Sequence, residues 1–157
     1  MFSISVKTPS IKIASLLTRE IMLGAGVLVA NNYKERLNKG MGVDEGGNIV
    51  KLKELSAATI ENKGSSIPLI DTTDMVGSFR ADPATVTENK VVLNFPASES
   101  WKAAIHQKGI TLLLKSVTIP ARPHVGFSDK DLKDATKSIE TNTGQKLKEG
   151  IKIGKAE

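Results

Sequence analysis

The chain has 157 residues, of which 39% are hydrophobic and 25% charged, a composition typical of one soluble globular domain with its own core. It contains no cysteine, which excludes disulfides, thiolate catalysis and zinc sites built on cysteine. The net charge of +5 is spread along the chain, so a solvated lysine-rich surface and an attraction to nucleic acid or acidic proteins both stay open. Aromatic residues make up only 4%, too few for platforms that stack single-stranded nucleic acid.

The first residues alternate apolar and polar side chains, which predicts a short strand at 2–6 and not a signal peptide. A long helix is expected from about Ser10 to about Leu37, and its apolar run 21–30 is too short to span a bilayer. Two apolar stripes cover more than half of its circumference, so the helix is either deeply buried or also packed on a neighbouring subunit. The stripes are Ala14, Leu17, Ile21, Ala25 and Leu28, and Leu16, Leu23, Val27 and Ala30. If the helix also packs on a neighbouring subunit, Leu16, Leu23 and Val27 are the candidate interface residues.

Residues 39–47 are rich in glycine and are predicted to form a loop. Its acids, Asp44 and Glu45, lack the spacing of a calcium-binding loop, so a plain turn is expected. Ser56 is then in place to cap a short helix. Gly24 and Gly26, inside the long helix, are expected to serve close packing or a kink, because no strand precedes them as a dinucleotide-binding loop would need.

The middle of the chain predicts a helical turn, a pair of strands and another helix. Asp71 or Thr73 is expected to cap the turn through Val76, and residues 79–81 and 90–95 are expected to pair as strands. A helix capped by Ser98 or Ser100 should follow and end at Gly109. The apolar run 110–114 and the alternating residues 116–119 then predict further strands.

Two prolines, Pro120 and Pro123, flank Arg122 and make a stiff, extended elbow. We expect Arg122 to be fixed by a carboxylate or a backbone carbonyl, either in its own chain or across a seam to the next subunit. Ser128, followed by acidic residues, should cap the last helix, with Leu132, Ala135 and Ile139 as its apolar face.

The predicted fold class is α+β, a small antiparallel sheet packed by a long N-terminal helix and a C-terminal helix. One domain is expected at 1–143, and the lysine-rich residues 144–157 are expected to form a tail that becomes ordered in an assembly.

Catalytic chemistry is not predicted. The two histidines, His106 and His124, have no Gly-x-Ser-x-Gly elbow and no metal-ligand spacing beside them, so neither a cofactor nor a metal is expected. Residues 69–73 are similar to the active-site turn of retroviral-type aspartic proteases, but Thr73 stands where that motif has glycine. A helix cap at Asp71 explains the same residues more simply.

Three separated blocks share their order and spacing with one known family. They are residues 42–59, residues 69–79, and residues 103–109 joined to 119–129. The most specific part is Ala-x-Ile-His-Gln-x-Gly followed by Ile-Pro-Ala-Arg-Pro. In these blocks the chain resembles the phage virion morphogenesis (tail completion) family of Mu-like and P2-like bacteriophages. It departs from the pattern at Thr73, Lys108 and His124. The motif residues of this chain are Asp71, Thr72, His106, Gln107, Gly109, Pro120, Arg122 and Pro123.

The resemblance implies a structural, non-enzymatic virion protein at the neck or the head-proximal end of the tail, made in the cytoplasm of the bacterial host. It also implies a homo-oligomeric ring, a hexamer by analogy, around the DNA channel. The implied partners are head connector or adaptor proteins and tail terminator or tube proteins, with no membrane. The alternative is a small basic nucleic-acid-binding protein.

Overall fold

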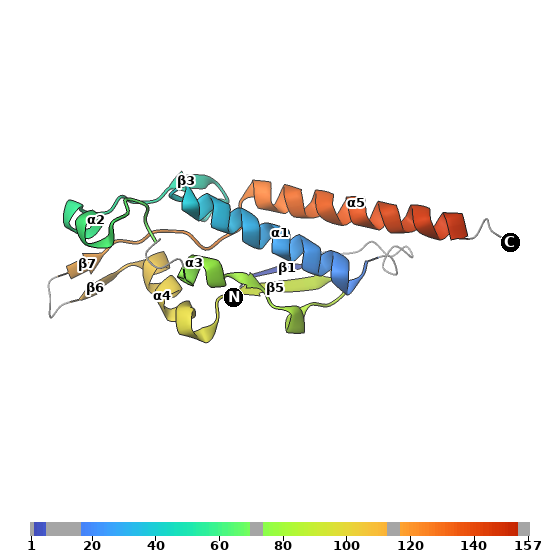
Figure 1. Cartoon of the computed structure of the whole chain (residues 1–157), viewed down its shortest axis with the longest axis horizontal. Helices are drawn as coiled ribbons and strands as arrows, with labels where there is room; N and C mark the ends of the chain where they lie inside the picture. The colour runs from blue at the N-terminus through green and yellow to red at the C-terminus, as the bar shows by residue number, and fades with distance from the viewer. Residues whose placement is uncertain (1, 6–16, 70–73, 113–116, 154–157) are drawn as a thin grey trace.

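The computed structural model describes residues 2–5, 17–69, 74–112 and 117–153, and shows an elongated α+β molecule (Figure 1). The expected fold class is confirmed. The elements in chain order are β1 (Phe2–Ser5), α1 (Arg19–Asn38), β2 (Met41–Val43), β3 (Ile49–Lys51), α2 (Ala57–Lys63), α3 (Asp74–Ser78), β4 (Arg80–Ala81), a 3-10 turn (Pro83–Thr85), β5 (Lys90–Asn94), α4 (Ala97–Lys108), β6 (Ile110–Leu112), β7 (Val117–Ile119) and α5 (Asp129–Ile153).

The long helix α1 begins at Arg19, later than the sequence predicts. Thr18 has an extended backbone, and its hydroxyl accepts the amide hydrogen of Ile21 at 3.5 Å, so it is the N-cap. The expected start at Ser10 lies outside the described residues, but an unbroken helix from there was a wrong prediction. The apolar stripe continues across the cap, and periodicity alone does not reveal a break of that kind.

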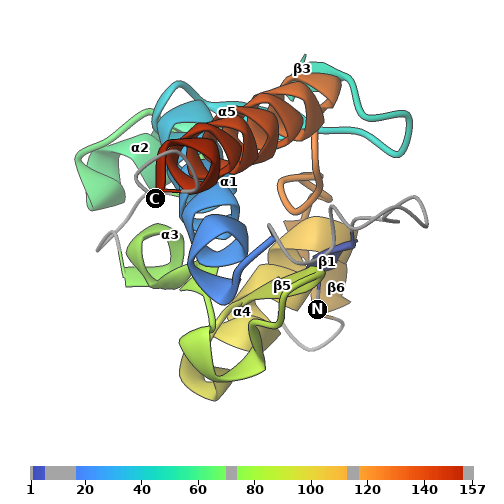
Figure 2. The same cartoon turned by 90° about the vertical axis from the view of Figure 1, so that its right-hand side faces the viewer.

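A three-stranded antiparallel sheet, in the order β1-β5-β4, supports one side of α1. Phe2 pairs with Leu93, and Arg80 pairs with Asn94, so the expected strands are confirmed. Gly26 lets the helix approach this sheet, because a Cβ at that position would lie 2.6 Å from a methyl carbon of Val91. Figure 2 shows α1 between the sheet and α5.

Three of the six aromatic side chains, Tyr33, Phe79 and Phe95, gather in this core. The rings of Tyr33 and Phe79 have centroids 4.3 Å apart, and those of Phe79 and Phe95 are 4.9 Å apart. Tyr33 comes from α1, whereas Phe79 and Phe95 come from the ends of the paired strands, so the cluster fixes the helix on the sheet.

Two further pairs of short antiparallel strands, β2 with β3 and β6 with β7, lie outside the three-stranded sheet. Strands β6 and β7 lie where further strands were predicted, and they pair with each other. In contrast, β2 lies inside the segment 39–47 that was predicted to be a loop, and it pairs with β3 just beyond that segment. Strands of three residues are too short to show alternation, which explains the error. The Asp44 carboxylate accepts the amide hydrogens of Gly46 and Asn48, each at 2.9 Å, and so forms the plain turn that was expected.

Helix termini follow the predicted residues at several places. Ser56 caps α2 and Gly109 ends α4, as predicted. The predicted serine cap of α4 is wrong. Pro96 occupies the N-cap without a side-chain bond, and its carbonyl accepts the amide hydrogens of Glu99 and Ser100. A proline φ of −60° already suits a helix start there.

Helix α5 packs on α1 and continues through Gly144 to Ile153, into the segment predicted to be a tail, and its last turns reach beyond α1 (Figure 1). Ala135 and Ile139 are buried as predicted, but Leu132 is 44% exposed. The division into a domain and a tail at residue 143 stays a prediction. Among the described residues, no helix is both long and apolar enough to cross a membrane.

Candidate functional site

The cationic side chain of the elbow is buried and bonded within its own chain. Arg122 is 5% exposed. Its Nε donates to the carbonyl of Lys53 at 2.9 Å, and its Nη2 donates to the carbonyl of Glu54 at 3.3 Å. These carbonyls belong to the segment between β3 and α2. The expected carbonyl partner is therefore found, and it lies in the same chain.

The end of α4 holds the next part of the elbow. The Gln107 Oε1 accepts the amide hydrogens of His124 and Val125, both at 2.9 Å, and the carbonyl of His106 accepts the amide hydrogen of Arg122 at 2.8 Å. One side chain and one carbonyl of α4 thus satisfy three backbone donors of a segment that has no regular secondary structure.

Two glycines allow the elbow to lie directly against other backbone segments. Gly109 has φ +72°, and a Cβ there would lie 2.6 Å from the amide nitrogen of Ala121. A Cβ on Gly42 would lie 2.0 Å from the carbonyl oxygen of Pro123, which accepts the amide hydrogen of Val43 at 3.0 Å. Any side chain at either position would push the elbow away from α4 or β2.

His124 is fully buried, and its partners decide its tautomer. Its Nε2 lies 3.1 Å from the carbonyl oxygen of Ala103, which only accepts, so Nε2 carries the hydrogen. Its Nδ1 therefore accepts from the Tyr33 hydroxyl at 3.0 Å. Burial lowers the pKa of His124 to about 4 and raises the pKa of Tyr33. The neutral ring links α1 to α4 through the elbow.

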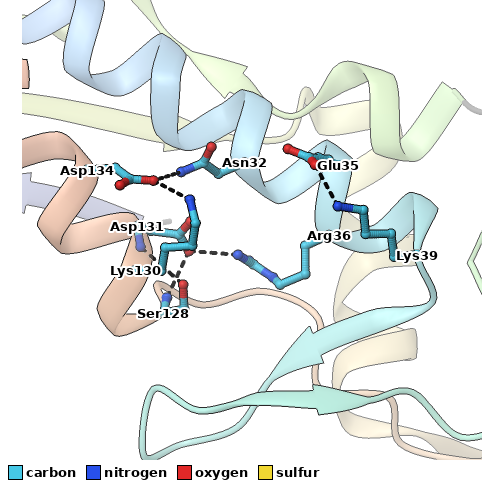
Figure 3. Close-up of polar contacts among 8 residues, drawn as sticks. All are labelled: Asn32, Glu35, Arg36, Lys39, Ser128, Lys130, Asp131 and Asp134. Carbon is cyan, nitrogen blue, oxygen red and sulfur yellow. Dashed lines mark hydrogen bonds and ion pairs between the residues drawn. The ribbon is translucent and has the colours of Figure 1, made fainter.

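A buried ion pair joins α1 to the start of α5 (Figure 3). Arg36 Nη1 lies 2.7 Å from Asp131 Oδ2, and the two side chains are 6% and 2% exposed. The same carboxylate oxygen accepts the amide hydrogen of Ser128 at 2.8 Å, while Ser128 Oγ accepts the amide hydrogen of Asp131 at 3.1 Å. This is a capping box in which the acid also neutralises a buried guanidinium. Arg36 Nη2 donates to the carbonyl of Gly126 at 3.1 Å.

Exposed polar contacts surround this buried pair (Figure 3). Asp134 on α5 accepts from Asn32 Nδ2 on α1 at 3.1 Å and also pairs with Lys130. Glu35 pairs with Lys39 at 2.6 Å within α1. Exposed ion pairs add little stability, so the buried pair carries the electrostatic contact between these helices.

Most of the motif residues meet at the elbow. His106, Gln107 and Gly109 at the end of α4 contact the segment that contains Arg122 and Pro123. Pro120 lies beside Gly109, because a Cβ on this glycine would lie 3.1 Å from the carbonyl carbon of Pro120. The His106 side chain is half-buried, and burial followed by the charges of Arg122 and Lys63 lowers its pKa.

Three predicted residues lie outside the described part of the chain. Asp71 and Thr72 are among them, so the protease-like turn and the proposed helix cap stay predictions. Leu16 is the third. Of the other two candidate interface residues, Leu23 is half-buried against the core and Val27 is 46% exposed.

The sequence reasoning missed Arg36, Asp131 and Tyr33 as polar connectors. The Ser-x-x-Asp spacing at 128–131 is a capping-box signal that points to Asp131. Nothing local identifies its arginine partner, which lies 95 residues away. Within the described ranges, no three acidic or histidine side chains form a group that could hold a metal ion.

Comparisons with protein-family models, curated proteins and solved structures found no match for this chain. The resemblance to tail completion proteins therefore rests on the motif residues themselves. The elbow and the buried ion pair together fix the positions of α1, α4, α5 and the β2–β3 hairpin relative to one another.

Replacing Arg122 tests the elbow. Arg122→Ala leaves the carbonyls of Lys53 and Glu54 unpaired and should lower the free energy of unfolding by about 1–3 kcal/mol, measured by urea denaturation. Arg122→Lys should recover only part of this, because an ammonium lacks the forked donors. Lys53→Ala keeps the acceptor carbonyl and should unfold like the wild type. Equal stability of Arg122→Ala and the wild type would contradict this role.

Asp131→Asn tests the buried ion pair. The amide keeps the shape of the carboxylate but leaves the Arg36 charge buried and unpaired, so the expected loss is about 3–5 kcal/mol of unfolding free energy. The matched control is Glu35→Gln, which breaks an exposed pair one residue before Arg36 and should leave the unfolding midpoint nearly unchanged. Similar midpoints for the two variants would argue against the buried pair.

His124 should make stability depend on pH. Its pKa is about 4 in the folded protein and near 6.5 when unfolded, so the unfolded chain binds more protons between these values. The free energy of unfolding should therefore fall as pH drops from 6.5 to 4, by up to about 1.4 kcal/mol per pH unit from this group. His124→Gln should show a shallower dependence, since the carboxylates are common to both proteins. In NMR spectra of the wild type, an imidazole that titrates near 6.5 at this position would contradict the prediction.

Proposed function

We propose that this chain is a structural subunit of a phage virion. It forms a homo-oligomeric ring at the neck, completes the tail and joins it to the head connector. The order and spacing of the three motif blocks support the proposal, as does the internal role of the motif residues at the elbow, where they hold backbone segments together. A rigid frame of this kind suits a protein whose task is to present fixed surfaces to its neighbours.

The observation that carries the proposal is the outer face of α1. Residues 21–33 contain no charged side chain, although the helix is a surface element. Gly24 and Val27 are exposed, and Leu23 and Leu28 are half-buried. The outer face of a surface helix in a monomeric domain is normally charged or polar. Among the described residues, a Cβ on Gly24 would meet nothing within 4 Å, so packing within that part of the chain does not explain this glycine. Contact with another subunit would account for both features.

The charge distribution on α5 supports a contact with DNA in the ring channel. Lys133 and Lys137 are exposed one turn apart on one helix face, next to Lys130, which pairs with Asp134. The same row would serve the alternative function, a nucleic-acid-binding protein that acts without assembling. That alternative predicts a steep salt dependence of DNA affinity in the isolated monomer.

Val27→Asp tests the proposed ring. The wild type should form oligomers by light scattering and rings in negative-stain images, whereas the variant should be monomeric, because a carboxylate would be desolvated in the interface. Its unfolding midpoint should change little, since Val27 is 46% exposed. Leu132→Asp, at a 44% exposed position on α5, is the matched control and should still assemble. A wild-type chain that stays monomeric at high concentration would overturn the proposal.

A further inference from the structure

We draw no further inference here: the strongest candidate, the apolar groove of about 470 Å³ beside α4 with the exposed Trp101 on the same helix and the exposed strand β6 beyond its end, carries nothing, because nothing in the described part of the structure shows what covers it.

Discussion

A buried charge cannot remain unpaired, and this constraint organises the contact between the two long helices. Asp131 is almost inaccessible, so its carboxylate must be neutralised and hydrogen-bonded. It meets both needs by accepting from the backbone at Ser128 and pairing with Arg36. The start of α5 and the last turns of α1 are therefore fixed together by one group. Sliding either helix by a turn would separate the charges, so the ion pair both attracts α1 to α5 and fixes the register between the two helices.

The elbow continues directly into this pair. It follows β7, lies against the end of α4 at Gly109, is held by Gln107 and reaches the Ser128 cap, so α4 and α5 are tied through one short segment. The prolines limit the conformations of the unfolded chain, which lowers the entropy cost of fixing it. Most of the hydrogen bonds of the elbow involve backbone groups, and the positions of these groups depend on the path of the chain.

In this arrangement, interior and exterior side chains have different roles. Polar side chains of the interior hold segments together, while apolar side chains at Val27 and Trp101 remain outside. An apolar exterior of this kind is costly for an isolated domain and useful in an assembly. The rigid frame matters for such a role, because surfaces held in fixed relative positions can repeat the same contact from copy to copy.

The sequence by itself determined what depends on neighbours within a few residues. Ser56, Gly109 and Ser128 end or begin helices as predicted, because capping is local. The stiffness of the elbow and a carbonyl partner for Arg122 could also be predicted, since both follow from residue chemistry. Some elements were missed even so. The hairpin of β2 and β3 is too short to show a period, and α5 runs through a glycine that suggested its end.

Only the tertiary structure decided which distant groups meet. Arg36 and Asp131 are 95 residues apart, and Tyr33 and His124 are 91 apart. No spacing rule connects positions so far apart, because their proximity follows from the packing of whole helices against one sheet. Burial then sets their chemistry: the same imidazole would titrate near neutrality on a surface, and here it stays neutral.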